Sequence, residues 1–327
     1  MDPIDPYLVA RRVRRATQLG VPAAELRTDL YEHVAHGVVA PAYLGVDPLA
    51  SRISIAIALM GSANALGGWA SLHVRGNTWF DGSAPDGTDR DVLVHCRPGS
   101  QLRVRNGIRP SQGVLRPVEV EMLGPYAATT MARATYDEML VASHLREAVV
   151  VLDMATSTTS GVPHTTLDQV VSVVDAHHKT RGIAQARSAL ALSSSRSASP
   201  WETRTRLVAQ LDVGIEGLLV NVPVFTLSGE LIGIADLFDP RTGLVIESDG
   251  SHHRGIEQHA DDNVREEGFE RAGCVVCRVV SLDHSRRWPL VGRIAAAHRD
   301  AKTSTARGWT LDKPDWWHTW PAAQRWA

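Results

Sequence analysis

Residues 236–253 constrain the fold of this chain more than any other stretch, because three carboxylates fall on what the pattern predicts as one β-hairpin. Asp236 precedes the turn signal Asp-Pro-Arg-Thr-Gly over 239–243, and Glu247 and Asp249 follow it. Gathered carboxylates repel one another and lose hydration when they are partly buried. A fold rarely collects them for stability alone, so this hairpin is a candidate functional site.

The placement of these carboxylates predicts a cation site. Asp236 and Glu247 are about equally far from the turn centre, so their Cβ atoms would lie roughly 4.5–5.5 Å apart if directly opposed. Glu247 and Asp249 are two residues apart and share one face of their strand. Such oxygen ligands suit Mg²⁺, or Mn²⁺, and a site of this kind hydrolyses phosphodiesters by activating water. An exposed acidic hairpin is the alternative, which the apolar neighbours Ile234 and Ile246 disfavour.

The composition is that of an ordinary globular protein. The 327 residues suggest about two domains, and 44% hydrophobic with 21% charged residues allow a substantial core. No apolar run approaches the ~20 residues of a membrane span, and the first residues lack an apolar signal core. We therefore expect a cytoplasmic protein with no membrane partner. The net charge of −2 gives no global basic field for nucleic acid, although a local patch can suffice.

Cys274 and Cys277 form a C-x-x-C motif, which is typical of zinc and redox sites. Here the motif lies in a predicted strand, where residues three apart point to opposite faces and cannot share a metal. Together with Cys96 there are three cysteines, too few for a disulfide framework. We predict buried core thiols.

The first 45 residues are predicted to form a winged-helix-like module. A helix over 7–19, a second from Pro22 to about Leu30 and a β-ribbon over 34–43 follow from the apolar spacing and the breakers. The module could contact a DNA backbone and groove, or it could present a solvated arginine face, and the sequence does not choose between these. The first helix carries Arg11, Arg12, Arg14 and Arg15.

Residues 46–192 are predicted to form a mixed α+β region without a catalytic constellation. We expect helices over 49–66 and 129–139 and a strand over 92–97. His95 is expected to be an isolated structural histidine, and His177 to lie on a polar surface helix.

A serine-rich joint at 193–199 opens a third predicted domain, residues 193–308, with a sharper pattern than the rest. Its order is αβββαβα, in which a later helix crosses over to a strand that pairs alongside the hairpin. The expected elements are helix 199–211, strands 218–226, 230–238 and 244–249, helix 256–272, strand 274–280 and helix 290–298.

This order, with an acid on the middle strand and E-x-D on the next, resembles the PD-(D/E)XK nuclease superfamily and its restriction-endonuclease-like αβββαβ core. More closely, residues 199–283 are similar to the very-short-patch-repair-endonuclease-like domain of actinobacterial proteins. The matching stretches are Ser-Pro-Trp-Glu-Thr-Arg, Asn-Val-Pro-Val, Gly-Ile-Ala-Asp-Leu, Val-Ile-Glu-Ser-Asp-Gly-Ser-His-His-Arg, Asp262-x-x-Arg265 and Val-Val-Cys-Arg-Val.

Residues 1–155 resemble, more loosely, the AbiEi-type antitoxin module that is often fused in front of this domain. The stretches that carry this resemblance are Gly-Val-Val-Ala-Pro, Ala-Leu-Gly-Gly-Trp-Ala-Ser-Leu and Thr-Thr-Met-Ala-Arg-Ala. The two resemblances together imply a DNA-acting protein with a winged helix in front of a nuclease fold.

The superfamily's name implies a lysine at the position that Asp249 occupies, and no lysine lies near the hairpin. A lysine would orient the attacking water and offset negative charge, so another group must do so. His253 is the candidate base, as a neutral imidazole that accepts a proton near pH 7. His252 is the alternate, since adjacent residues point to different sides, and the other histidine would then contact phosphate or solvent.

Glu202 has two open roles. The resemblance implies an acid on the first helix that completes the metal site, whereas Ser199-x-x-Glu202 is also a capping box. Further on, Gln258, Asp262 and Arg265 fall on one helical stripe, as phosphate-binding or supporting residues. Arg265 would either bind the scissile phosphate or pair with Asp262, and the pairing is favoured.

Residues 309–327 hold five of the nine tryptophans. Their indoles could stack on unpaired bases, but we favour a clasp over the preceding domain or a contact with a partner protein or second copy, because it buries a large apolar area. The leading prediction for the whole chain is a Mg²⁺-dependent DNA endonuclease. The alternative is a DNA-binding regulator, or antitoxin-like protein, whose nuclease fold no longer cuts.

Overall fold

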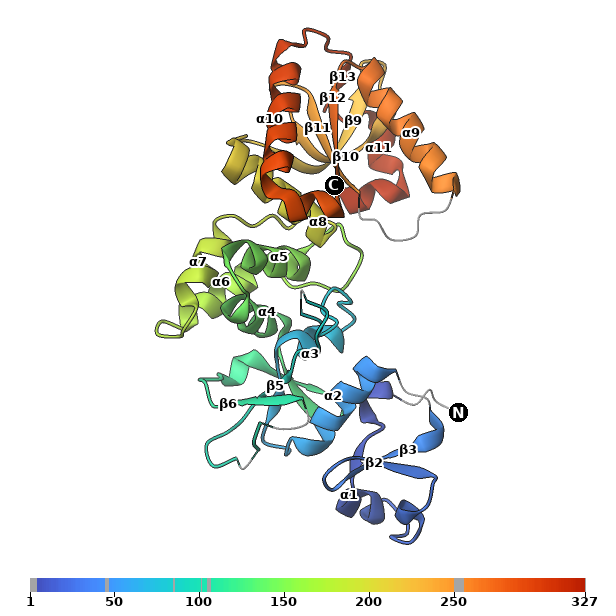
Figure 1. The fold of residues 1–327 in the computed structure, drawn as a ribbon, viewed down its shortest axis with the longest axis vertical. Coiled ribbons are helices and arrows are strands. Elements are labelled where there is room, and N and C mark those ends of the chain that lie inside the picture. Colours follow the sequence, from blue (N-terminus) through green and yellow to red (C-terminus); the bar gives the residue numbers. More distant parts are fainter. Residues whose placement is uncertain are drawn as a thin grey trace. The chain divides into compact units, whose positions relative to one another are not determined.

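The computed structural model describes residues 5–44, 47–84, 86–100, 102–104, 107–249 and 256–326, with the backbone alone for Leu44 and for 256–263. The chain is a mixed α/β protein that divides into two compact units (Figure 1). The first unit holds residues 1–143 and 162–187, and the second holds 144–161 and 188–327. Among the described helices, none is long and apolar enough to cross a membrane.

The first unit begins with a three-stranded sheet of order β1-β3-β2, where β1 is Arg11–Arg12, β2 Tyr31–Ala35 and β3 Val38–Pro41. The predicted helix over 7–19 is wrong: Pro6–Leu8 is a 3-10 turn (η1), and α1 covers only Val13–Gln18. The second predicted helix is also wrong, because only the 3-10 turn η2 (Glu25–Arg27) forms there. Pairing of β1 with β3 overrides the local helical spacing.

The remainder of the first unit is a five-stranded sheet of order β6-β5-β4-β8-β7 with helices packed against it. The expected helix over 49–66 ends at Leu59, and β4 follows it. His177, expected on the surface, is 6% exposed and contacts Glu119. The elements are η3 (Ala42–Leu44), α2 (Pro48–Leu59), β4 (Ala65–Leu66), α3 (Gly68–His73), β5 (Val92–His95), β6 (Ile108–Ser111), η4 (Pro117–Glu119), β7 (Val120–Leu123), β8 (Tyr126–Thr129), α4 (Met131–Val141), α6 (Leu167–Ala176) and α7 (Ile183–Leu190).

Residues 144–161 join the second unit because a buried ion pair ties them to it. Asp153 of α5 (Leu145–Thr156) is fully buried, and its carboxylate accepts from Arg206 at 2.7 Å. The same carboxylate accepts from the Thr203 hydroxyl at 2.9 Å and from the Ser194 N–H at 2.7 Å. A buried charge without these partners would be strongly destabilising, so the contacts fix α5 against α8 (Pro200–Val208).

The second unit contains the αβββαβα order predicted from the sequence. Its five-stranded sheet has the order β12-β11-β10-β9-β13; β10 is antiparallel to β9 and β11, and β11 and β12 are parallel. The remaining elements are η5 (Ala209–Val213), β9 (Leu219–Thr226), β10 (Leu231–Asp239), β11 (Leu244–Asp249), α9 (Ile256–Arg271), β12 (Val275–Val280), η6 (Ser281–Arg286), α10 (Arg287–Thr303), β13 (Trp309–Thr310), α11 (Asp315–Thr319) and η7 (Pro321–Trp326).

Helices α9 and α10 cover opposite sides of this sheet, and a core lies under each (Figure 1). Cys277 belongs to the core with Leu290 and Ile294 of α10, whereas Cys274 belongs to the core with Phe269 of α9. The prediction of buried thiols on opposite faces is therefore confirmed. Burial raises the pKa of the Cys274 thiol to about 12, so this group stays protonated and is a poor metal ligand.

The tryptophan-rich tail is a clasp over its own unit, as favoured from the sequence. Strand β13 pairs with the edge strand β9, which covers that edge of the sheet. Trp317 is 1% exposed and lies edge-on to Phe225, with ring centroids 5.2 Å apart. The Trp316 indole N–H donates to the Gly229 carbonyl at 2.9 Å.

Truncation of the buried indole should destabilise the second unit. We expect Trp317→Ala to lower the free energy of unfolding by about 3–5 kcal/mol, because it leaves a cavity against Phe225. Trp288 is 75% exposed, so Trp288→Ala should change this free energy by less than about 0.5 kcal/mol. Urea unfolding followed by circular dichroism measures both, and equal losses in the two variants would contradict the clasp.

Candidate functional site

The β10–β11 hairpin brings Asp236 and Glu247 together. The strands pair Asp239 with Leu244 and Leu237 with Ile246, and the next pair in this register is Asp236 with Glu247. The turn is held by Asp239, whose carboxylate accepts from the Arg241 N–H at 3.0 Å and from the Thr242 hydroxyl at 2.8 Å. Gly243 closes the turn with φ of 76°, a conformation that favours glycine.

Asp236 is partly buried in a site that disfavours its charge. One carboxylate oxygen accepts from the Ser248 N–H on the neighbouring strand at 2.7 Å. Burial, followed by the negative charges of Glu247 and Glu202, raises the pKa of Asp236 well above its usual value, and the Ser248 bond and Arg265 only partly oppose this. A cation bound here would reverse the penalty, because it favours the ionised carboxylate.

Glu247 is 7% exposed, and Arg265 of α9 holds it through an ion pair of 2.6 Å. The arginine reaches the strand because Gly233 of β10 has no side chain. A Cβ at Gly233 would lie 2.7 Å from Cγ of Arg265 and 2.8 Å from its Cδ. The expected partner of Arg265 was Asp262, whose side chain lies outside the described residues; the pairing with Glu247 is the one that the structure describes.

Glu202 takes part in a helix start and also lies near the site. Its N–H donates to the Ser199 hydroxyl at 3.2 Å, which caps α8. Its carboxylate accepts from the Ala198 N–H at 2.7 Å, one residue earlier than a capping box requires. Burial raises the pKa of Glu202, and its charge contributes to the raised pKa of Asp236. The predicted capping box is therefore not formed: Ser199 alone caps the helix, and the Glu202 carboxylate binds the N–H before it. A metal-binding role for Glu202 stays a prediction.

Asn221 is a site residue that the sequence analysis did not single out. It is 2% exposed, and its amide donates to the Glu202 carboxylate at 2.6 Å and to the Arg196 carbonyl at 2.7 Å. Its φ of 48° is unusual for a strand residue, although asparagine tolerates this region better than most. The stretch Asn-Val-Pro-Val was a signal, since proline in a strand marks an irregular or edge position.

The third predicted ligand, Asp249, is the last residue of β11 and pairs with Val280 of β12. Among the described residues, no group of three or more Asp, Glu, His or Cys is placed to hold a metal ion. Of the three predicted ligands, Asp236 and Glu247 are the two that the hairpin register pairs directly. His252 and His253 lie outside the described residues, as do the side chains of Gln258 and Asp262.

The four predicted DNA-contacting arginines do not share one helix. Arg11 and Arg12 form β1, whereas Arg14 and Arg15 are exposed on α1. The Arg12 guanidinium donates to the carbonyls of Ala58, at 2.8 Å, and Leu59 at the end of α2. A positive group at a helix C-terminus is stabilising, which gives Arg12 a structural role.

Comparison with known proteins adds no family to this description. No protein-family model, curated protein or solved structure matches the chain. The function must therefore be inferred from the site itself.

The raised pKa of Asp236 predicts a stability penalty that depends on pH. Since the folded state holds this proton more tightly than the unfolded state, the ionised carboxylate costs stability above the raised pKa. This cost fades as the pH falls to the ordinary value of 3.8. We expect Asp236→Asn to be more stable than the wild type at neutral pH, with the difference shrinking towards about pH 4.

Urea unfolding of both proteins from about pH 4 to about pH 8 measures this difference. The control is Asp300→Asn, at an exposed carboxylate on α10, for which the stability difference should stay near zero throughout. An Asp236→Asn protein that is less stable than the wild type at neutral pH would show that the carboxylate is held favourably, against this account.

Proposed function

We propose that the second unit is a Mg²⁺-dependent nuclease domain that hydrolyses DNA phosphodiester bonds. The observation that carries the proposal is the cross-strand pair of Asp236 and Glu247, partly buried on one hairpin with the charge of Asp236 disfavoured. Enzymes place such perturbed carboxylates at reactive sites. The element order and the strand order around the pair agree with the restriction-endonuclease-like core that the sequence resembles.

The two carboxylates fit Mg²⁺ as oxygen donors. Mg²⁺ is held through one or two carboxylates and keeps several waters, so a pair suffices and Asp249 would add a third donor. When bound, the ion supplies a water of lowered pKa and positive charge for the phosphate oxygens. Mn²⁺ accepts the same ligands. Asp236 is the principal ligand in this proposal, because a cation would offset the burial and repulsion that disfavour its ionised form.

Arg265 takes over part of the role of the lysine that the superfamily's name implies. Its guanidinium contacts Glu247 at 2.6 Å and offsets negative charge at the site. A guanidinium stays protonated and cannot act as a base, but it binds phosphate oxygens in pairs. Proton removal from water is assigned to His253, with His252 as the alternate. Glu202 and Asn221 position the strand and helix that frame the hairpin.

DNA contacts outside the site are proposed for the exposed arginines of the first unit. Arg14 and Arg15 lie on α1 beside the β2–β3 hairpin, which could serve as a wing. Arg11 would add to this surface, whereas Arg12 is engaged by α2. DNA is the expected macromolecular partner, and a contact with a second copy or partner protein through the tail would use the exposed Trp316 and Trp320.

Cleavage of supercoiled plasmid tests the nuclease directly. We expect nicking or linearisation with Mg²⁺ or Mn²⁺, none with chelator, and a loss of about 100-fold or more in Asp236→Asn and Glu247→Gln, which keep shape but remove charge. Asp300→Asn, an exposed control, should cleave like the wild type. Activity that Asp236→Asn retains would identify a contaminant or another site.

The proposed role of Arg265 predicts a second effect on cleavage. Gly233→Ala should displace the Arg265 stem and lower the cleavage rate about tenfold, in parallel with Arg265→Met. Gly292→Ala is the control, since a Cβ there meets nothing within 4 Å. Full activity in both Gly233→Ala and Arg265→Met, with folding checked by thermal melting, would remove Arg265 from the mechanism.

The alternative function is a DNA-binding regulator whose nuclease fold no longer cuts. Two observations favour it: no lysine lies near the hairpin, and the described residues contain no three-ligand metal group. Thermal melting with Mg²⁺ separates the two functions. A metal at about 100 times its dissociation constant stabilises a protein by about 2.7 kcal/mol, so a nuclease site should raise the melting temperature of the wild type and leave that of Asp236→Asn unchanged. No shift, together with DNA binding, would favour the regulator.

A further inference from the structure

The first unit contains a polar cleft that neither the sequence analysis nor the proposed nuclease uses. Its volume is about 790 Å³, within the range of small-molecule sites. Residues of β5, β6 and α4 and the segment 177–181 line it. A cleft with polar walls in a folded unit needs either water or a ligand to satisfy those walls.

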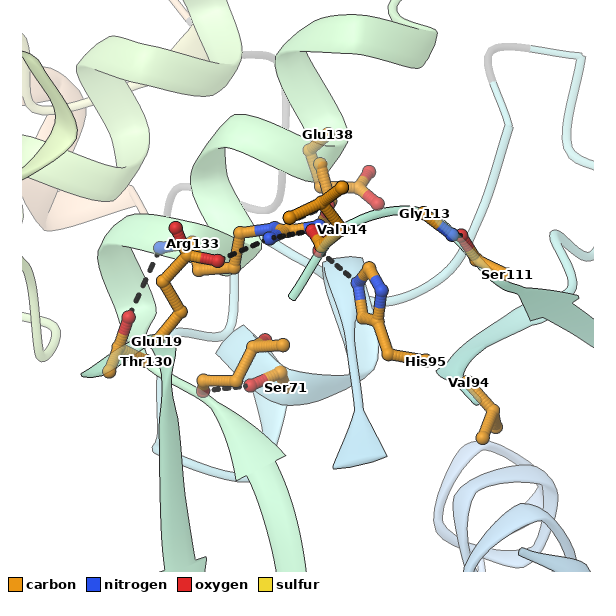
Figure 2. A network of polar contacts seen from close by, with 12 residues as sticks. Ser71, Val94, His95, Ser111, Gly113, Val114, Glu119, Thr130, Arg133 and Glu138 are labelled. Atoms are coloured by element: carbon orange, nitrogen blue, oxygen red, sulfur yellow. Dashed lines mark hydrogen bonds and ion pairs between the residues drawn. The ribbon is translucent and has the colours of Figure 1, made fainter. Parts of the chain in front are cut away.

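A buried chain of charges forms one wall of this cleft (Figure 2). Arg133 of α4 is 3% exposed and donates to Asp137 at 3.0 Å and to Glu119. Glu119 in turn contacts Nε2 of His177 at 2.7 Å, and the His177 ring stacks on Tyr136 with centroids 5.1 Å apart. One guanidinium thus holds two carboxylates, and the wall is rigid and preorganised.

His95 ends this chain with one nitrogen committed and the other unsatisfied. Its Nε2 lies 2.7 Å from the Asp137 carboxylate. The Asp137 carboxylate also accepts from Arg133 at 3.0 Å, so Asp137 is the acceptor in both contacts. The Nε2 atom then carries the proton. Nδ1 of this side chain, which is 3% exposed, has no hydrogen-bond partner among the described residues.

An unsatisfied buried atom costs about 1–3 kcal/mol, which a bound hydrogen-bond donor would recover. In the neutral ring Nδ1 is an acceptor, so the matching ligand group is a hydroxyl or an N–H. Figure 2 shows the ring between α4 and the segment with Ser111, at the end of β6, and Gly113. Both of those residues line the cleft.

Three cations also line this cleft. Arg109, Lys179 and Arg181 all belong to its lining, and the last two are exposed. Across the described ranges, no carboxylate lies within 4.0 Å of any of the three, whereas Arg133 is fully paired. Unpaired arginine and lysine at a cleft favour an anion, and arginine in particular matches the oxygens of phosphate.

We propose that this cleft binds a phosphate ester of nucleotide size. Its phosphate would lie against Arg109, Lys179 and Arg181, and a hydroxyl or amino group of its sugar or base would donate to Nδ1 of His95. The ligand is either a free nucleotide or the phosphorylated end of a nucleic-acid strand, since both offer the same groups.

Isothermal titration calorimetry of the full-length protein tests this cleft. A chelator is present throughout, so that the proposed metal site stays empty. The probes are adenosine and uridine 5′-monophosphate, inorganic phosphate and a 5′-phosphorylated trinucleotide. We expect at least one nucleotide to bind about tenfold more tightly than phosphate, and the double variant Lys179→Ala with Arg181→Ala to weaken it about tenfold. The charge-matched control is Arg187→Ala with Lys302→Ala, both exposed and outside the cleft, which should bind like the wild type.

A second variant tests the buried end of the cleft. His95→Gln keeps an N–H donor for Asp137 but removes the acceptor at Nδ1, so nucleotide binding should weaken about tenfold while phosphate binding stays unchanged. If the trinucleotide binds more tightly than the mononucleotides, the result supports the site and identifies the phosphorylated end of a nucleic-acid strand as its ligand. The proposal is overturned if no probe binds, if phosphate binds as tightly as every nucleotide, or if the Lys179 and Arg181 double variant binds like the wild type.

Discussion

The register of the β10–β11 hairpin is the constraint on which the candidate site depends. Side chains alternate along a strand, so a slip of one residue would move Asp236 away from Glu247 and turn the apolar positions of both strands to the wrong face. The turn fixes this register through Asp239, whose buried carboxylate holds the backbone of Arg241 and the hydroxyl of Thr242. Asp239 thus shapes the turn, and the resulting register places Asp236, three residues earlier on β10, in the candidate site.

The electrostatic penalty of placing three acids close together is reduced, but not abolished, by neighbouring hydrogen-bond donors and an arginine. Ser248 donates its N–H to Asp236, Asn221 donates its amide to Glu202, and Arg265 neutralises Glu247. Burial and repulsion still raise the pKa of Asp236, so its negative charge is only partly compensated. A fold selected only for stability would replace this carboxylate, because a neutral side chain of the same shape avoids the penalty.

The sequence predicts elements well where local signals and long-range packing agree. In the second unit, apolar runs between turn residues give the strands and their order, and alternation gives the opposite faces of Cys274 and Cys277. Prediction from sequence fails where a residue far away in the chain determines which element or contact forms. Strand β1 forms through pairing with β3, against the helical spacing of residues 7–19. Arg265 pairs with Glu247 through the packing of α9, which spacing along the helix cannot show, and the φ of Asn221 has no periodic signature.

The buried acids of the polar cleft and those of the hairpin differ in how far neighbouring charges compensate them. In the first unit, Asp137 and Glu119 are almost fully buried, yet Arg133 lies between them and the pKa of Asp137 is lowered. Those carboxylates are satisfied without any ligand, whereas Nδ1 of His95 is one of several buried polar atoms among the described residues that have no hydrogen-bond partner. Arg109, Lys179 and Arg181 line the same cleft. In the second unit the pKa of Asp236 is raised instead. The two proposals therefore involve ligands of opposite charge: an anion with a hydrogen-bond donor at the cleft, and a cation at the hairpin.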